Sequence, residues 1–427
     1  MNSVSSPEMS EHTFNGLGIA PKILDVLTTL GFTVPTPIQY QAIPTGVEGK
    51  DVIGIAQTGT GKTLAFGIPM IQRLMGGEGR GLVLLPTREL ALQVEETLQK
   101  VGRSLGLKTV VLIGGASMGP QISGLRRDPH IVIATPGRLI DHLEQKNIRL
   151  DHVAILVLDE ADRMLDMGFW PQIKRIITLV PLARQTMLFS ATLSKEIMEL
   201  ATRQMKLPTR IEVAPSGTTS DRVSQEFFIV RKDEKLRLLE KVLGDYRGST
   251  LVFSRTKHGA KKILGSVRAM GHSAAEIHGN RSLGQRREAL EGFKTGRYRV
   301  LVATDIASRG IDVKGIELVL NYDLPMDAAD YVHRIGRTAR AGADGHAISF
   351  AMPDQRREMR DIERLIRKTL PISSLPVLPP PRPGQHVEPD RPRSFRRSAP
   401  PRRSFQGSGG YSRRPASGSR SPRRSFR

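Results

Sequence analysis

A glycine-rich loop is the clearest candidate for phosphate chemistry in this sequence. The loop lies between an apolar run at 52–55 and a helical pattern that begins near Leu64. Glycines let backbone N–H groups point at an anion, and the start of a helix adds its positive dipole. We expect Lys62 to reach the β- and γ-phosphates of ATP and the Thr63 hydroxyl to bind Mg²⁺. The loop consists of Ala56, Gln57, Thr58, Gly59, Thr60, Gly61, Lys62 and Thr63.

The strict form of such a loop starts with glycine, whereas this one starts with Ala56. A glycine-rich turn without a ligand is therefore the alternative interpretation. The strand–loop–helix setting favours the phosphate loop, because it is the setting in which such loops bind phosphate.

Two adjacent acids follow a second apolar run, at 153–158. Acids at the carboxyl end of a buried parallel strand lie where open α/β sheets bind ligands. We expect Asp159 to hold Mg²⁺, largely through its waters, since Mg²⁺ dehydrates reluctantly. Glu160 is then placed to orient and deprotonate the attacking water. The alternative, an acidic cap at the start of a helix, is disfavoured by the pairing with Lys62.

Apolar runs of strand length alternate with helical patterns through the first 370 residues. Strands that are apolar throughout, separated by helices, predict parallel sheets covered on both faces. A polar patch at 215–221 interrupts the alternation, which then restarts. The expected strands are 52–55, 82–85, 110–113, 131–133, 153–158 and 187–189, then 226–230, 250–253, 299–302, 317–320 and 347–350.

The same pattern predicts how the chain is divided. We expect an α/β protein with two tandem domains, at 12–213 and 223–370, joined by a linker at 214–222. Residues 1–11 are polar and predict a flexible N-terminus rather than a secretory signal. The two halves show no obvious sequence repeat, but their architecture is expected to be alike.

The segment 371–427 differs from the rest in composition. It holds 13 arginines, no lysine and two acids, so it contributes +11 of the chain's net charge of +22. Twelve of the 28 prolines also lie there. Such a segment buries too little apolar surface to offset its ordering entropy, so we expect 371–427 to be a disordered tail. Arg-Ser-Phe recurs at 393–395, 403–405 and 424–426. Arginine interleaved with aromatic residues favours loose RNA binding; a solubilising tail is the alternative.

Composition excludes some functions. With no cysteine, the chain has no disulfide, thiolate metal site or cysteine nucleophile. No apolar run approaches the roughly 18–20 residues needed to cross a bilayer. The basic balance indicates a polyanionic partner such as nucleic acid, and we expect a cytoplasmic protein.

Together these motifs resemble those of the DEAD-box ATP-dependent RNA helicases of superfamily 2. Residues 159–162 are the Asp-Glu-Ala-Asp tetrapeptide of that family, and the similarity runs from about Phe14 to Pro371. Within the family the chain is most similar to the bacterial RhlE-like group, which often ends in a basic tail. The resemblance implies two tandem RecA-like domains. The other motifs lie at 31–39, 56–63, 86–90, 114–115, 135–139, 190–192, 251–256, 303–305, 308–312 and 331–340.

The resemblance also implies roles at the nucleotide. Gln39 is similar to the glutamine that reads the adenine edge, for which an amide has both donor and acceptor. Phe14 would stack on the base, with a core contact as the alternative. Arg337 and Arg340 match two arginine fingers that reach the γ-phosphate, and Asp312 matches the ribose contact.

RNA is expected across both domains, where small and hydroxylated residues permit close approach to phosphates without reading sequence. Ordinary turn chemistry is the alternative for this set. A separate group is implied in coupling hydrolysis to RNA binding. The RNA candidates are Thr87, Arg88, Gly115, Thr135, Gly137, Arg138, Arg255, Thr304 and Gly310, and the coupling candidates are Asp162, Ser190, Thr192 and His333.

The implied activity is RNA-stimulated ATP hydrolysis that unwinds short RNA duplexes or remodels RNA–protein complexes, ribosomal or in mRNA decay. A DNA helicase of the same superfamily and a nucleic-acid annealing chaperone acting through the tail are the alternatives. Two positions depart from the family pattern, namely Leu283, where glutamine is usual, and Ala339, where glycine is usual. The RNA target and the oligomeric state stay open.

Overall fold

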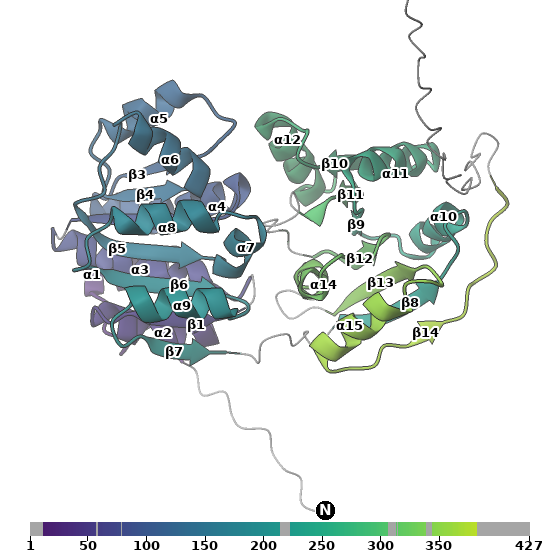
Figure 1. Cartoon of the computed structure of the whole chain (residues 1–427), viewed down its shortest axis with the longest axis horizontal. Helices are drawn as coiled ribbons and strands as arrows, with labels where there is room; N and C mark the ends of the chain where they lie inside the picture. Colours follow the sequence, from purple (N-terminus) through teal and green to yellow (C-terminus); the bar gives the residue numbers. More distant parts are fainter. Residues whose placement is uncertain are drawn as a thin grey trace, which may run out of the picture. The chain divides into compact units, whose positions relative to one another are not determined.

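Two parallel sheets organise the chain (Figure 1). The computed structural model describes residues 12–56, 59–77, 79–213, 223–305, 313, 315–338 and 344–381. In the first sheet the strand order is β3-β4-β2-β5-β6-β1-β7, and in the second it is β10-β11-β9-β12-β13-β8-β14. Every pair of neighbouring strands runs parallel. The predicted α/β class is therefore confirmed.

The first sheet and its helices precede residue 214. Its strands are β1 (Val52–Ile55), β2 (Arg80–Leu84), β3 (Thr109–Leu112), β4 (Ile131–Ala134), β5 (Val153–Asp159), β6 (Gln185–Ser190) and β7 (Thr209–Glu212). Its helices are α1 (Pro21–Thr29), α2 (Pro37–Val47), α3 (Lys62–Met75), α4 (Arg88–Gly102), η1 (Arg103–Leu105), α5 (Met118–Leu125), α6 (Pro136–Glu144), α7 (Ala161–Asp166), α8 (Trp170–Thr178) and α9 (Lys195–Gln204).

The second sheet follows residue 222. Its strands are β8 (Val223–Ile229), β9 (Thr250–Phe253), β10 (Ala274–Ile277), β11 (Val300–Ala303), β12 (Leu318–Asn321), β13 (Gly345–Ala351) and β14 (Ile372–Ser373). Its helices are α10 (Lys235–Asp245), α11 (Lys257–Ala269), α12 (Leu283–Lys294), α14 (Ala328–Ile335) and α15 (Arg356–Ile366).

Alternate residues of each buried strand feed two hydrophobic clusters. In β5, Ile155 and Val157 join the cluster under α1 to α4, whereas Leu156 and Leu158 join the cluster under α5 to α9. This follows from the two-residue period of a strand, whose successive side chains point to opposite faces. In Figure 1, α8 and α9 lie in front of the first sheet and α3 lies behind it.

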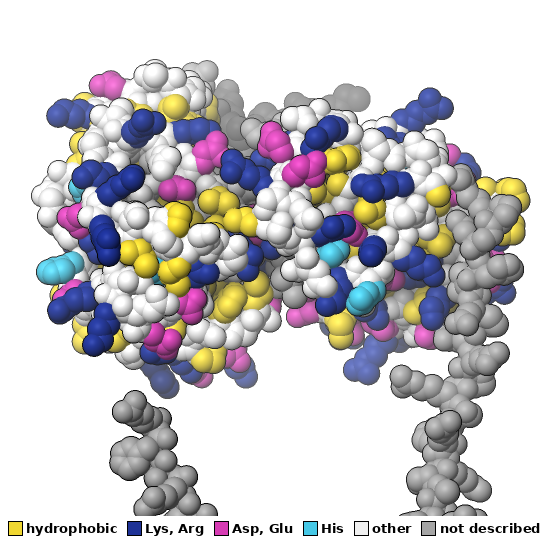
Figure 2. Space-filling model, turned by 90° about the horizontal axis from the view of Figure 1, so that it is seen from above, with side chains coloured by type: hydrophobic (Ala, Val, Ile, Leu, Met, Phe, Trp, Pro, Cys, Tyr) yellow, Lys and Arg dark blue, Asp and Glu magenta, His cyan; other side chains and the backbone are white. Residues whose placement is uncertain are grey.

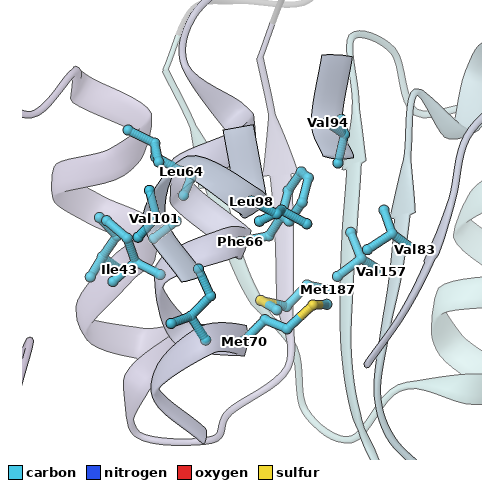
Figure 3. Close-up of a cluster of buried hydrophobic side chains, with 14 of the residues drawn as sticks. Ile43, Leu64, Phe66, Met70, Val83, Val94, Leu98, Val101, Val157 and Met187 are labelled. Carbon is cyan, nitrogen blue, oxygen red and sulfur yellow. The ribbon is translucent and has the colours of Figure 1, made fainter. Parts of the chain in front are cut away.

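The cluster behind the first sheet consists of buried hydrophobic side chains. Phe66, on α3, is fully buried, and its ring centroid lies 5.6 Å from that of Phe189 on β6. Figure 3 shows Phe66 and Met70 of α3 facing Met187 of β6 and Val157 of β5. The cluster fixes α3, and therefore the loop that precedes it, against the sheet.

The second sheet is covered in the same way. Residues of α10 and α11 pack with Val252 and Leu320 on one face. Residues of α12 pack with Leu251 and Val319 on the other face, beside a further cluster that contains α14 and α15. Two faces covered by helices are what apolar parallel strands require.

The structure differs from the sequence prediction at the start of the predicted tail. Residues 371–381 lie on the second domain, where Ile372–Ser373 forms β14 beside β8. The Pro371 carbonyl accepts a hydrogen bond from the Phe227 amide, and Arg237 Nε donates to the Pro379 carbonyl over 2.7 Å. The short strand satisfies backbone groups along an exposed sheet edge. Residues 382–427, like 1–11 and 214–222, lie outside the described part.

Positive and negative side chains are intermingled on the face of the molecule drawn in Figure 2. Lys and Arg alternate with Asp and Glu over the face drawn in Figure 2. No single basic patch stands out on that face.

Phe66→Ala should lower the free energy of unfolding of the first domain by about 3–5 kcal/mol, because it leaves a cavity in a fully buried cluster. The chain's single tryptophan, Trp170, lies on α8 of the same domain, so its fluorescence during urea unfolding reports on that domain. Leu182→Ala, at a side chain that is 75% exposed, is the control and should change stability by less than about 0.5 kcal/mol. Equal losses in the two variants would contradict the packing of Phe66.

Candidate active site

The phosphate-loop lysine begins helix α3. Gly59 and Gly61 adopt φ values of 89° and 91°, which L side chains rarely reach, and this backbone turns the chain from β1 into the helix. Lys62 is 6% exposed, and its Nζ donates to the Ala56 carbonyl over 3.1 Å. The ammonium group is thus held inside the loop in which a phosphate would lie. Gln57 and Thr58 are outside the described residues, and Thr63 is half-buried in the first turn of α3.

The candidate adenine reader contacts this loop directly. Gln39 and Thr36 form a capping box at the start of α2, where Gln39 Oε1 accepts the Thr36 amide at 2.9 Å. Gln39 Nε2 donates to the Gly61 carbonyl, also at 2.9 Å. A Cβ on Gly61 would lie 2.5 Å from that nitrogen, so glycine is needed there for space as well as for φ. The cap therefore places the amide at the loop.

Phe14 occupies a core position. It is 4% exposed within the cluster under α1 to α4. The structure thus shows the core contact that was the alternative interpretation of Phe14. Stacking of Phe14 on a base stays a prediction.

The two acids lie at the carboxyl end of β5, next to Lys62. Asp159 is the last residue of the strand, and its Oδ1 lies 3.7 Å from Lys62 Nζ. Glu160 has φ 54° and ψ 52°, a left-handed conformation that costs a non-glycine residue about 1 kcal/mol or more. Its side chain makes no capping hydrogen bond to α7; instead Arg163 Nη1 donates to its Oε2. The helix-cap alternative is thus not what the structure shows.

The pKa values of these two buried acids are shifted in opposite directions. Desolvation raises the pKa of Asp159 to about 6; the Lys62 charge opposes this rise and the Glu160 charge adds to it. Desolvation also acts to raise the pKa of Glu160, but the Arg163 and Lys62 charges outweigh it, and the pKa falls below its ordinary value. A carboxylate poorly compensated by the protein is one that a cation stabilises.

Thr63 and Asp159 fit a magnesium ion. A hydroxyl and a carboxylate are hard oxygen ligands, and Mg²⁺ is usually held by one or two carboxylates with waters and substrate phosphates. Over the described residues no cluster of three or more His, Cys, Asp or Glu forms a cage for a metal. The raised pKa of Asp159 is consistent with a carboxylate that awaits a cation.

Asp162 connects this site to the end of β6. Its Oδ2 accepts hydrogen bonds from the Ala191 amide, the Thr192 amide and the Thr192 hydroxyl at 2.9–3.1 Å. The Asp162 amide donates to Ser190 Oγ over 3.2 Å. The structure therefore brings together three of the four predicted coupling residues. The fourth, His333, is on α14 of the second domain.

The predicted RNA contacts of the first domain follow the ends of three neighbouring strands, β2, β4 and β3. Thr87 caps α4 by accepting the Leu90 amide, and Arg88 begins that helix. Arg88 lies against Gly115, where a Cβ would be 2.1 Å from its Nη1. Arg138 Nη1 donates to the Ala116 carbonyl over 3.0 Å. Thr135 and Gly137 lie at the start of the same α6, so these loops form one surface.

The second domain gathers its candidates at the corresponding edge. Arg255 follows β9, where its amide donates to Asp323 Oδ2 over 3.1 Å, and Thr304 follows the neighbouring β11. Arg337 lies just beyond α14, and its Nε donates to the His333 carbonyl at 3.3 Å. Gly310, Asp312, Ala339 and Arg340 lie outside the described residues.

Sequence reasoning missed the charged groups that hold these edges together. Arg163 was not predicted, although its spacing of three from Glu160 on a helical segment was a usable signal. In the second domain, Arg334 Nη2 donates to Asp305 Oδ2 over 2.8 Å, and Lys235 Nζ lies 3.1 Å from Asp323 Oδ1. Arg334 and Lys235 are both nearly inaccessible to solvent, which their residue types do not suggest.

Fold and site together define a nucleotide hydrolase with paired RecA-like domains. The family models agree, because residues 36–200 match the DEAD/DEAH box helicase domain and residues 234–342 match the helicase conserved C-terminal domain. The chain belongs to the DEAD-box helicase family and is an ATP-dependent RNA helicase.

Two curated relatives illustrate the similarity. The ATP-dependent rRNA helicase RRP3 of Debaryomyces hansenii is 42% identical over 373 residues, which is 86% of this chain and 78% of that protein. The DEAD-box ATP-dependent RNA helicase CshA of Bacillus cereus is 41% identical over 370 residues, or 86% of this chain and 70% of that protein.

Solved structures carry the same fold. S. cerevisiae Dbp5 bound to RNA and ADP BeF3 gives a TM-score of 0.77 at 29% identity, covering 85% of this chain and 95% of that one. Mss116p bound to ssRNA and AMP-PNP gives 0.78 at 29% identity, covering 87% and 81%. Among the described residues, no helix has the length and apolarity to span a membrane.

The raised pKa of Asp159 predicts that the free energy of unfolding depends on pH. Between the unfolded pKa near 3.8 and the folded value of about 6, the folded state binds more protons, so stability falls as pH rises through this window. Asp159→Asn removes the buried charge. In nucleotide-free protein it should therefore be more stabilising at pH 8 than at pH 5, with a difference on the order of 1–3 kcal/mol.

Urea unfolding of both proteins at the two pH values measures this difference. Asp25→Asn, which alters an exposed acid on α1, is the control and should show no such dependence. A stability change for Asp159→Asn that is the same at pH 5 and pH 8 would contradict the raised pKa.

Proposed function

We propose that the chain locally separates short RNA duplexes, or remodels RNA–protein complexes, through RNA-stimulated ATP hydrolysis at the site around Lys62. The supporting observation is the order of strands in the first sheet. Nucleotide candidates follow β1 and β5, and RNA candidates follow β2, β4 and β3, all at one carboxyl edge. Since β2 and β5 are neighbours, the two sets of loops adjoin.

In the first domain, Lys62 binds the β- and γ-phosphates, while Gln39 and Phe14 hold the adenine. Glu160 orients the attacking water and takes its proton. Thr63 and Asp159 would hold Mg²⁺, which when bound neutralises charge on the phosphate oxygens.

The second domain completes the site on closure. ATP and single-stranded RNA together favour a state in which Arg337 and Arg340 reach the γ-phosphate and Asp312 reaches the ribose. Such closure is a population shift, so it requires ligands that bind the closed state better. His333 joins the group formed by Asp162, Ser190 and Thr192 and couples hydrolysis to RNA.

RNA would lie on the surface of both domains that contacts its sugar–phosphate backbone. This surface fits a bent single strand and rejects an A-form duplex. The first-domain contacts come from the loops after β2, β4 and β3. The second-domain contacts come from Arg255, Thr304 and Gly310. One strand of a short duplex is released when this surface closes on the other.

Finer placements belong to the same proposal. From the basic tail we infer a place among the bacterial RhlE-like helicases, although the relatives compared above are RRP3 and CshA. We infer a first domain at 12–213, a second domain that starts at residue 223 and includes 371–381, and a cytoplasmic place of action. The curated relative RRP3 is named an rRNA helicase, and ribosomal RNA is accordingly one candidate target, beside RNAs of mRNA decay.

ATP hydrolysis with and without single-stranded RNA tests the proposal. Wild-type turnover should rise with RNA and less with a matched DNA strand, because DNA lacks the 2′-OH. Glu160→Gln should lower RNA-saturated kcat by about 10²–10⁴-fold, the usual contribution of a general base. If Glu160→Gln were as fast as wild type, Glu160 would not be the general base. If residues 1–213 alone hydrolysed ATP at the full rate without RNA, the active site would not be divided between the two domains.

Cutting the chain after Pro381 tests the annealing alternative, which the basic composition of the tail favours. This cut keeps β14 and the Arg237 contact in place while removing all 13 tail arginines. RNA-stimulated hydrolysis should persist, with weaker RNA binding whose dependence on salt is shallower, because fewer phosphates are neutralised. Loss of stimulated hydrolysis at saturating RNA would instead favour the chaperone.

A further inference from the structure

Arg163 and Glu160 form a buried ion pair at the start of α7. Arg163 Nη1 donates to Glu160 Oε2, and the two side chains are 1% and 3% exposed. Glu160 directly precedes α7, and Arg163 lies three residues later in the first turn of that helix. Nothing in the proposed binding of ATP or RNA uses Arg163.

Glu160 is restrained on both sides. Its backbone is held in the left-handed region, and its amide donates to Asp159 Oδ1 over 3.0 Å. Its side chain is tied at Oε2 by Arg163. The ion pair at Oε2 restricts the orientations that the carboxylate can adopt, and so limits where its other oxygen can lie.

The guanidinium of Arg163 makes few hydrogen bonds for a buried group. In the part of the chain that the structure describes, its Nε and Nη2 are buried and have no hydrogen-bond acceptor. Its backbone amide bonds to Asp162 Oδ1 at 3.0 Å, which any residue there would do. The side chain is therefore held by Glu160, and a role as a general scaffold for the helix is disfavoured.

We propose that Arg163 is a positioning residue for the hydrolytic step, which holds Oε2 of Glu160 so that Oε1 is presented to the attacking water. The inference rests on the proposed role of Glu160. It follows the general logic of a catalytic base that is oriented by a third group. Arginine suits this role because its guanidinium stays charged even when it is buried, whereas a buried lysine readily loses its charge.

The test compares Arg163→Met, Arg163→Lys, Glu160→Gln and the double variant Arg163→Met/Glu160→Gln in ATP hydrolysis at saturating RNA. Arg163→Met should lower kcat by about 10–100-fold, the effect of a small misplacement of a reacting group. KM for ATP should stay within about twofold, since ground-state binding does not use Arg163. Arg163→Lys should recover part of the lost kcat.

The double variant separates positioning from structure. If Arg163 acts only through Glu160, the double variant should be no slower than Glu160→Gln alone, because removing the base leaves nothing to orient. Arg184→Met is the matched control. It removes another buried arginine of the first domain, one that bonds to Thr186 Oγ1 and the Pro181 carbonyl, and should leave kcat unchanged.

Two results would overturn the inference: a kcat for Arg163→Met equal to that of Arg184→Met, or losses that add in the double variant. Thermal unfolding and binding of a non-hydrolysable ATP analogue show which variants are folded. Should Arg163→Met not fold, the kcat-against-KM split of Arg163→Lys decides instead. If Glu160→Gln alone kept the wild-type kcat, the proposed role of Glu160 as the base would be wrong. That result is distinguishable from a failure of the Arg163 inference.

Discussion

Burial of charge at the carboxyl edge of the first sheet constrains the rest of this site. Lys62, Asp159, Glu160 and Arg163 are each less than one-tenth exposed. A buried charge without a partner destabilises a fold by several kcal/mol, so the four groups are tolerated only while they pair. The turn at Gly61, the end of β5 and the first turn of α7 must therefore be placed closely relative to one another. The hydrophobic cluster beneath α3 supplies that placement.

The arrangement also shows why stability and function oppose each other here. The pKa of Asp159 is raised because Lys62 compensates its burial incompletely. Glu160 adds backbone strain at φ 54°. Both features store unfavourable free energy in the ligand-free protein, and a cation held at Asp159 would relieve the first of them. Proteins accept such local costs at sites where ligands bind.

Much of this was visible in the sequence, for physical reasons. Buried parallel strands are apolar throughout, so β1, β5 and β9 were recognisable, and the residues after them could be assigned to one edge. The strands that were missed lack that signature. In β7 only Ile211 is buried, β10 contains Glu276, and β14 has two residues. Burial of a charged residue depends on what packs around it, which spacing alone does not reveal, and Arg163 and Arg334 escaped prediction for that reason.

The order of the strands gives a physical basis for linking nucleotide to RNA. Neighbouring strands lie about 4.8 Å apart, and β5, which carries Asp159, is beside β2, which leads to Thr87 and Arg88. On its other side β5 adjoins β6, whose end is bonded to Asp162. If one ligand displaces the β5 edge, the loops proposed to bind the other ligand lie only one strand spacing away. Rigid packing of both sheet faces favours such transmission over local relaxation, since a close-packed interior deforms little. The coupling between the two ligands can thus be a property of one shared edge and needs no long relay through the domain.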